Sequence, residues 1–286
     1  MGILSNKIDF MMLCTVKNAN PNGDPLDGNR PRTTYSGQGE ISDVCIKRKI
    51  RNRLQDMGEN IFVQSDDKRD DEYTSLSERA SKTITEYDDK EDYAKQACQQ
   101  WIDVRSFGQV FAFKSAKSDK DKGVSVGVRG PVSIHQAVSV SPVEVASIQI
   151  TKSVNSEPSA KGEKSSDTMG TKHMIPFGLY IIKGSINVQL AEKTGFTEDD
   201  AEKIKESLRT LFVNDCSSAR PDGSMEVCRV YWWKHNNKTG QYSAAKVHNS
   251  ISIKLKDDVE IPSDFSDYEI TENDLDGLKP EVFEGI

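Results

Sequence analysis

IDFMMLCTV, residues 8–16, is an apolar run of strand length with polar residues on both sides. A short apolar run bounded in this way is typical of a strand buried in the centre of a sheet. A chain of 286 residues can bury a sizeable core around such a strand, as one large domain or as two smaller ones.

A polar loop follows this strand directly. NANPNGDPLDGNRPR, residues 18–32, contains three prolines, two glycines, four asparagines and two arginines. Proline fixes φ and glycine permits left-handed turns, so the loop is predicted to be stiff. One interpretation is a tight connection. The other is that the loop holds Arg30 and Arg32 for phosphate oxygens, which suit the planar guanidinium group.

SDVCIKRKIRNRLQDMG, residues 42–58, predicts a helix with Ser42 as its N-cap. Its apolar face is formed by Ile46, Ile50, Leu54 and Met57. Lys47, Arg48 and Arg51 fall on the opposite side. These three cations are either a solvated face or, together with the arginines of the preceding loop, an electropositive strip for nucleic acid.

The remaining chain alternates between strand and helix patterns around two insertions. Residues 59–100 indicate a polar, largely helical insertion, and residues 115–123 a charged loop. Residues 141–172 alternate at first and are then rich in Ser, Glu, Lys and Gly, which predicts a protruding hairpin.

Without these insertions the predicted order is strand, helix, strand, strand, helix, strand. The later elements are two strands within 124–145, a strand in 174–190, a helix in 197–215 capped by Thr197, and a strand in 226–236. This order is the ferredoxin-like arrangement that RNA-recognition folds share.

The formal net charge of −7 is unevenly distributed. Residues 257–286 contain eleven acidic side chains and one lysine, so the rest of the chain is net positive. We therefore predict an acidic, partly ordered C-terminal tail, and the overall acidity does not exclude a basic groove elsewhere.

The sequence carries no strong signal for catalysis, a metal or a cofactor. The five cysteines lack CxxC spacing, and the four histidines lack the spacing of metal ligands. Asp24 and Asp27 could bind a divalent metal, but two loop carboxylates are more often turn formers. No phosphate-binding loop or nucleophile elbow is present. VYWWKH, residues 230–235, could stack on bases but is more typical of a core strand.

Neither a signal peptide nor an apolar stretch long enough to span a bilayer is found. The scattered cysteines favour a reducing compartment. We therefore expect a cytoplasmic protein without a membrane partner.

Six motifs, taken together, resemble one family. They are NPNGDP with NRPR, SDVCIKRKIRN, DVRSFGQVF, VRGPVSI, TMGTKHMIPFGLY and LAEKTGF, in this order between about residues 8 and 250. The chain resembles the CRISPR-associated backbone subunit of the type I-C Cascade surveillance complex, in the Cas-seven superfamily.

The resemblance implies an α+β fold shaped like a hand. A modified ferredoxin-like palm, of the RNA-recognition-motif type, would comprise residues 1–58, 101–140 and 173–250. A helical insertion (59–100), a β-hairpin thumb (141–172) and the acidic tail (251–286) would be added to it.

The resemblance also implies a non-enzymatic role in antiviral defence. Copies of the subunit would stack head to tail along the spacer part of a guide RNA (crRNA), and their thumbs would kink the RNA at regular intervals. The bases between the kinks would stay available for pairing with target DNA, so the protein would hold backbone and shape. Further partners would be a Cas-five-type subunit, which processes the guide, and the large and small Cascade subunits.

The RNA-binding residues that the resemblance implies come from the loop, the helix, the VRGP motif and the thumb. They are Asn20, Asn22, Arg30, Arg32, Lys47, Arg48, Arg51, Arg129, Met169, Lys172 and His173. Relatives tend to have a basic residue where this chain has Thr171, so that contact would weaken or move to Lys172. The rival hypotheses are a metal-dependent ribonuclease that uses Asp24 or Asp27, and a general single-stranded RNA-binding protein.

Overall fold

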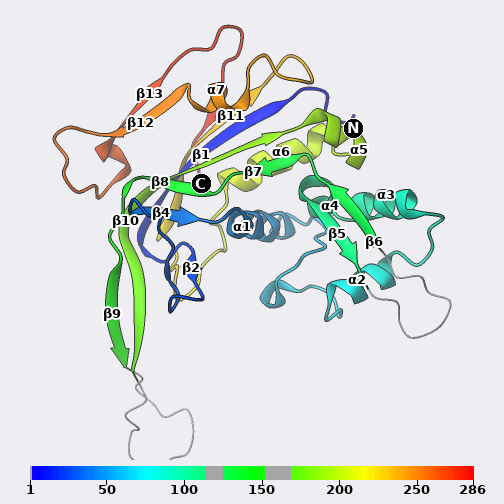
Figure 1. The fold of residues 1–286 in the computed structure, drawn as a ribbon, viewed down its shortest axis with the longest axis horizontal. Helices are drawn as coiled ribbons and strands as arrows, with labels where there is room; N and C mark the ends of the chain where they lie inside the picture. Colours follow the sequence, from blue (N-terminus) through cyan, green and yellow to red (C-terminus); the bar gives the residue numbers. More distant parts are fainter. Residues whose placement is uncertain (1, 114–124, 152–168) are drawn as a thin grey trace, which may run out of the picture.

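The computed structural model describes residues 2–113, 125–151 and 169–286, and an antiparallel sheet forms its centre (Figure 1). The strand order is β14-β11-β1-β10-β8-β4, and β7 and β9 also pair with β10. The strands are β1 (Ile8–Ala19), β4 (Gln38–Ile41), β7 (Val132–Ile134), β8 (Ala137–Pro142), β9 (Ala146–Thr151), β10 (Met169–Ile186), β11 (Met225–Lys234) and β14 (Glu281–Phe283).

Three two-stranded ribbons and seven α-helices complete the described part of the chain. The ribbons pair β2 (Gly23–Asp24) with β3 (Arg30–Pro31), β5 (Gly108–Ala112) with β6 (Ser125–Arg129), and β12 (Ile251–Leu255) with β13 (Tyr268–Glu272). The helices are α1 (Asp43–Asp56), α2 (Leu76–Thr83), α3 (Lys90–Gln100), α4 (Ile102–Phe107), α5 (Val188–Thr194), α6 (Glu198–Arg209) and α7 (Ala244–His248). Two 3₁₀ turns span Asp66–Lys68 and Phe265–Asp267. The predicted α+β class is confirmed.

β1 is buried on both faces because its alternating side chains enter two different cores. Phe10, Met12 and Cys14 pack in one core, whereas Met11 and Leu13 pack in the other. The central buried strand predicted from the apolar run is therefore confirmed.

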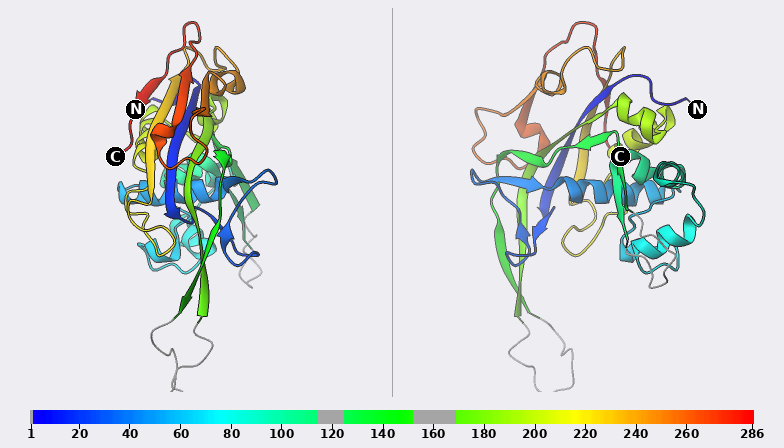
Figure 2. Two further views of the ribbon diagram at one scale, coloured as in Figure 1. Left: turned by 90° about the vertical axis from the view of Figure 1, so that its left-hand side faces the viewer. Right: turned by 45° about the vertical axis from the view of Figure 1, so that its right-hand side comes forward.

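Helices α1 and α6 cover the first of these faces, with their apolar residues directed at β1 and β10. Two views of the ribbon show them on one side of the sheet (Figure 2). Ser42 caps α1 by accepting a hydrogen bond from the Cys45 N–H, as predicted. Thr197 and Asp200 form a capping box at the start of α6. This helix ends at Arg209, earlier than the predicted 215.

Residues after about 59 form an insertion with a separate hydrophobic core. Its buried residues include Phe62, Ala80, Tyr93, Trp101, Phe111 and Val126. Because Phe111 lies in β5 and Val126 in β6, this core continues beyond residue 100, where the sequence suggested a return to the palm. The charged loop expected at 115–123 lies outside the described residues.

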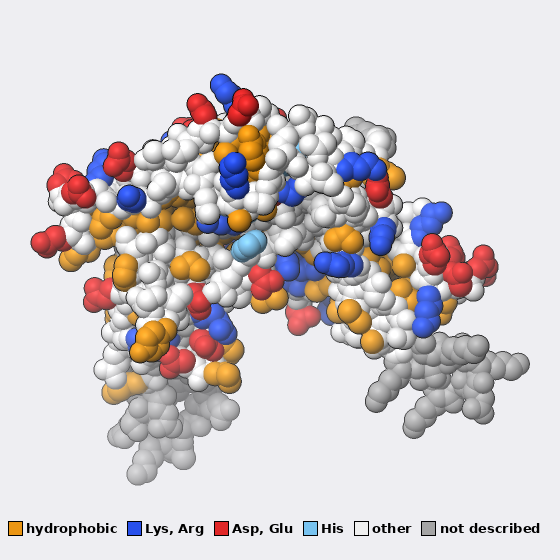
Figure 3. All heavy atoms as spheres, turned by 45° about the horizontal axis from the view of Figure 1, so that its top comes forward, with side chains coloured by type: hydrophobic (Ala, Val, Ile, Leu, Met, Phe, Trp, Pro, Cys, Tyr) orange, Lys and Arg blue, Asp and Glu red, His pale blue; other side chains and the backbone are white. Residues whose placement is uncertain are grey.

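The C-terminal segment is an ordered layer, and the prediction of a tail over 251–286 is wrong. The β12–β13 ribbon packs on the second face of the sheet, and β14 pairs with β11. Tyr268 and Leu278 are buried there. Apolar residues alternate with the acidic ones in this segment, so the acidic side chains stay in solvent while the apolar ones are buried. Figure 3 shows acidic side chains at the outer end of this C-terminal layer.

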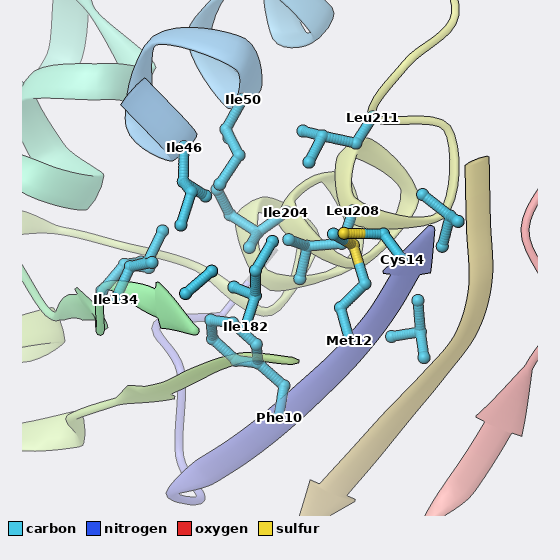
Figure 4. Packing of buried hydrophobic residues seen from close by; sticks show 14 of the residues in the cluster. Phe10, Met12, Cys14, Ile46, Ile50, Ile134, Ile182, Ile204, Leu208 and Leu211 are labelled. Atoms are coloured by element: carbon cyan, nitrogen blue, oxygen red, sulfur yellow. The ribbon is translucent and has the colours of Figure 1, made fainter. Parts of the chain in front are cut away.

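The main core fills the space between the sheet and α1 and α6. Figure 4 shows Phe10 and Ile182 of the sheet directed towards Ile46 and Ile50 of α1, and Met12 directed towards Leu208 of α6. The five cysteines are free thiols: Cys14 and Cys98 are buried, and Cys216 is exposed. In the described residues, no helix combines the length and apolar character needed to cross a membrane.

Candidate nucleic-acid interface

The proline-rich loop, residues 18–32, is a hairpin closed by its own hydrogen bonds. β2 pairs with β3 at its base. The Asp24 carbonyl accepts the N–H groups of Asp27 and Asn29, and the Asp24 carboxylate accepts the Leu26 N–H at 3.0 Å. Gly28 and Asn29 have φ values of 57° and 61°, in the left-handed region that glycine and asparagine tolerate. These bonds hold the tip of the loop in one shape.

Asn20 and Asn22 support the loop from inside. Asn20 is buried, and its Nδ2 donates to the Asn29 carbonyl at 2.6 Å. Asn22 Oδ1 accepts the Ser42 N–H at 2.9 Å, which attaches the loop to the beginning of α1. The two asparagines predicted to bind RNA therefore connect the loop to its surroundings.

Arg30 links this loop to the base of the β9–β10 hairpin. Its Nη1 donates to Ser147 Oγ at 3.0 Å and lies 3.5 Å from His173 Nδ1. Ser147 Oγ is also 2.8 Å from His173 Nδ1. Ser147 and His173 are opposite each other in the strand register. The structure thus brings together two predicted residues that are 143 positions apart in the sequence.

Both loop arginines are partly exposed and have acidic neighbours. Arg32 Nη2 lies 3.4 Å from Asp24 Oδ1, and Arg30 Nε lies 3.8 Å from Asp27 Oδ2. The side chains of Arg30 and Arg32 are 38% and 36% exposed. Partly exposed pairs of this kind are weak, so a phosphate can compete for either guanidinium.

The three helix cations do not form the solvent-facing strip that was predicted. Lys47 pairs with Asp43 at 2.9 Å on the surface of α1. Arg48 Nη1 donates to the Val63 carbonyl at 2.6 Å, and burial lowers the pKa of this guanidinium.

Arg51 points into the joint between α1 and the insertion. Its Nε donates to Asp103 Oδ2 at 2.9 Å, and the Asp103 carboxylate also accepts the N–H groups of Phe62 and Val63. The Arg51 side chain is only 12% exposed. Arg48 and Arg51 therefore attach the insertion to α1, whereas Lys47 pairs with a residue of its own helix.

The thumb hairpin consists of β9 and Met169–Met174 of β10, and it projects from the rest of the molecule in Figures 1 and 2. Opposite residues of an antiparallel pair point to the same face. Met169, Thr171 and His173 therefore share one face with Ser147. Lys172 lies on the other face, opposite Ile148. Relatives tend to have a basic residue at the position of Thr171. Because Lys172 points to the opposite face, its side chain does not occupy that position. The predicted tip of this hairpin lies outside the described residues.

Arg129 lies apart from the other predicted residues. It is exposed at the end of β6, in the insertion's ribbon, and α1 separates this ribbon from the β2–β3 hairpin (Figure 1). The loop and the thumb base contact each other, and Arg129 is not part of this contact.

The structure adds residues that the sequence analysis missed. Lys49 is buried on the inner side of α1, where it pairs with Asp215 and lies 5.7 Å from the centre of the Phe212 ring. Burial lowers the pKa of Lys49, and the charge of Asp215 offsets part of that effect. Arg220 pairs with the same carboxylate at 3.3 Å. On the helical wheel Lys49 flanks Ile46 at the edge of the apolar face, and this position was the available signal.

A family model described as CRISPR-associated protein Cas7 matches residues 6–273. The chain belongs to the Cas7 family. The resemblance noted in the sequence is therefore confirmed at the level of the family.

One curated Cas7 relative and two solved structures are similar to this chain. A CRISPR-associated protein Cas7 from Haloferax volcanii is 26% identical over 211 residues, which cover 70% of this chain and 62% of the relative. The chain thus spans less than two thirds of that relative's length. A chain of a "CRISPR RNA-guided surveillance complex, pre-nicking" is 14% identical with a TM-score of 0.48, and 83% of each chain is covered. A chain of a "CRISPR RNA-guided surveillance complex" is 18% identical with a TM-score of 0.44, with 79% of this chain and 68% of that one covered.

The aromatic strand of this Cas7 chain belongs to the core. Tyr231, Trp232 and Trp233 are each at most 1% exposed. The core interpretation of VYWWKH is confirmed, and base stacking by these three side chains is excluded by their burial. Within the described ranges, no group of three or more His, Cys, Asp or Glu side chains is arranged to hold a metal ion.

Proposed function

We propose that this Cas7 chain is a non-catalytic, crRNA-binding subunit of a type I-C Cascade complex. Copies of it polymerise along the spacer of the guide and present the bases for pairing with target DNA in antiviral defence. Its partners are the guide RNA, further copies of itself, and the Cas-five-type, large and small Cascade subunits. The complex acts in the cytoplasm.

The contact between Arg30 and the thumb base carries this proposal. It joins the loop that carries Arg30 and Arg32 to the projecting hairpin through Ser147 and His173. Phosphate oxygens are bound by arginine forks and by polar side chains of this kind. A surface that holds the RNA backbone, next to a hairpin that can separate bases, fits the role of a guide scaffold.

Both faces of the sheet are covered, which favours contacts with the RNA backbone over stacking of RNA bases on the sheet. The strand order β11-β1-β10, with β7 and β8 next to β10, supports the proposal of a ferredoxin-like palm. RNA-recognition motifs stack bases on an open face of such a sheet. In this chain α1 and α6 cover one face, and the β12–β13 ribbon covers the other. The RNA therefore lies along the loop and the thumb.

The predicted RNA-binding residues divide into two groups under this proposal. Direct contacts are assigned to the residues with accessible polar or apolar ends, namely Arg30, Arg32, Lys47, Arg129, Met169, Lys172 and His173. Asn20, Asn22, Arg48 and Arg51 act indirectly, because their polar groups already hold the loop or the insertion in place.

A salt titration of RNA binding tests the phosphate contacts. We expect Arg30→Ala, Arg32→Ala or Lys47→Ala each to weaken binding equally for unrelated RNA sequences. Each variant should lower the slope of log K against log salt by about one unit or less. A loss that depends on the RNA sequence would contradict backbone binding.

Purification with a CRISPR repeat–spacer transcript and the neighbouring genes tests the assembly. A uniform guide RNA in a multi-copy particle is the expected result. Monomers on heterogeneous RNA would favour the general RNA-binding alternative. Magnesium-dependent RNA cleavage that is lost in Asp24→Ala or Asp27→Ala would favour the nuclease alternative.

A further inference from the structure

Ser147 occupies the centre of the contact between the proline-rich loop and the thumb. A guanidinium can only donate hydrogen bonds, so the Ser147 hydroxyl oxygen accepts the bond from Arg30 Nη1 at 3.0 Å. The hydroxyl proton is then free to be donated to His173 Nδ1, 2.8 Å away. The bonds run in one direction, from Arg30 through Ser147 to His173.

This direction determines the form of the imidazole. Arg30 Nη1 also lies 3.5 Å from His173 Nδ1. With two donors on that side, Nδ1 accepts and the ring proton is on Nε2. The guanidinium is held at two points, because Nη1 contacts Ser147 and His173 while Nε faces Asp27 Oδ2 at 3.8 Å.

We propose that Ser147 is a positioning residue for RNA binding, which fixes the Arg30 guanidinium and the His173 ring in the orientation that receives the RNA backbone. The inference rests on the proposed function and adds to it a residue outside the implied RNA-binding set. A pre-oriented arginine loses less conformational entropy when it binds a phosphate. Because Ser147 is in β9 and Arg30 is in the loop, the same bond also connects the thumb to the loop.

An isosteric pair of variants isolates the hydroxyl. Threonine and valine have the same shape and both suit an exposed strand, but only threonine retains the hydroxyl. We expect Ser147→Val to weaken RNA binding about fivefold, in line with the net value of one typical solvent-exposed hydrogen bond. Ser147→Thr should stay within about twofold of the unaltered chain.

A double-variant cycle shows whether Ser147 acts through Arg30. In an Arg30→Ala background, Ser147→Val should have a smaller effect, because only the His173 ring is left for Ser147 to position. Equal affinities for the Thr and Val variants would overturn the proposal. An undiminished effect of Ser147→Val in the Arg30→Ala background would overturn it as well.

The histidine ring provides a readout that needs no RNA. In ¹⁵N NMR spectra of the full chain at a pH of about 8, His173 should show an Nε2–H tautomer with a hydrogen-bonded Nδ1. The hydrogen bond to Nδ1 should weaken in Ser147→Val, where only the 3.5 Å contact from Arg30 is left, and should persist in Ser147→Thr. His173→Gln assigns the signal. If the unaltered protein fails to bind RNA while the NMR signature is present, the proposed function is wrong, but the hydrogen bonds from Arg30 through Ser147 to His173 are confirmed. If it binds RNA without that signature, the positioning role fails.

Discussion

Individual charged residues of α1 differ in what they do, although they are close neighbours in the sequence. Lys47 is paired on the surface, Arg51 is paired with a fully buried carboxylate, and Lys49 is paired inside the main core. A buried ion pair is costly to break because the remaining partner keeps an uncompensated charge. Replacing a cation of this helix with alanine is therefore expected to lower the free energy of unfolding by an amount that depends on its position.

Arg51→Ala is expected to destabilise the fold by about 3–5 kcal/mol, since the buried Asp103 carboxylate would lose the cation that is hydrogen-bonded to it. Lys47→Ala should cost less than about 1 kcal/mol, as is usual for a surface pair. Chemical denaturation measures both values. The RNA salt slope should respond in the opposite way, falling for Lys47→Ala and staying unchanged for Arg51→Ala. A stable Arg51→Ala protein with a reduced slope would return Arg51 to the group of direct contacts.

Local patterns in the sequence were sufficient to predict α1, α6 and β1. Ser42 and Thr197 stand at the predicted helix starts, and the apolar spacing of both helices matches their buried faces. The role of Arg51 depends on Asp103, which is 52 residues away, and no helical periodicity records such a partner. For the same reason the family resemblance implied Arg30 and His173 as RNA-binding residues, but it predicted neither the contact between them nor the part of Ser147 in it.

At the level of elements, polar contacts join the insertion to the palm. Arg105 of α4 forms a two-pronged ion pair with Asp200 of α6, with distances of 2.8 and 3.0 Å. Burial opposes ionisation of Asp200, but the hydrogen bonds from Arg105 and Thr197 outweigh it and lower the pKa of this carboxyl below its usual value. A second pair, Lys203 with Glu59, lies 2.7 Å apart at the same joint.

The lowered pKa of Asp200 makes this joint dependent on pH. A carboxyl whose pKa is lower in the folded state contributes stability above its unfolded pKa of about 3.9, and this contribution is lost as the pH falls towards the folded value. Asp200→Asn should therefore destabilise the chain most near neutral pH, and the difference from the unaltered chain should shrink below a pH of about 4. Thermal denaturation as a function of pH measures this difference.

Asp199→Asn is the matched control for this experiment. Asp199 is the neighbouring residue, its side chain is 38% exposed, and it pairs with Lys203 one helical turn away. Its replacement should change stability by no more than about 0.5 kcal/mol at any pH. A constant difference for Asp200→Asn across the acid range would mean that the carboxylate charge contributes nothing to the joint.

At the level of the whole molecule, the sheet is the middle layer of three. The acidic C-terminal segment forms the outer layer opposite α1 and α6, and this arrangement removes the open sheet face from nucleic-acid binding. Composition alone suggested a tail, because the eleven acidic residues dominate the composition of this segment although apolar residues alternate with them. Counting the apolar residues at every second position would have revealed the strands.

Two substitutions in the same segment distinguish a layer from a tail. Tyr268 is 6% exposed and donates a hydrogen bond to Ser141, whereas Ile261 is 84% exposed. Tyr268→Ala should cost about 3–5 kcal/mol, as for other large buried aromatic residues. Ile261→Ala should stay within about 0.5 kcal/mol. Denaturant titration gives both values, and a tolerated Tyr268→Ala would show that the layer does not contribute to stability.

The uneven exposure of the five thiols gives the protein a built-in attachment point for a reporter dye. Reaction with a maleimide requires a thiolate that is in contact with solvent. Burial raises the pKa of Cys98 and Cys228 to about 11, and it also raises the pKa of Cys14 and Cys45, whereas Cys216 is exposed. The segment that carries Cys216 touches the proline-rich loop, because the Asn20 N–H donates to the Ala219 carbonyl at 2.9 Å. A fluorophore on the unaltered chain therefore lies beside the surface where the guide is proposed to bind, and can follow its arrival without an engineered cysteine.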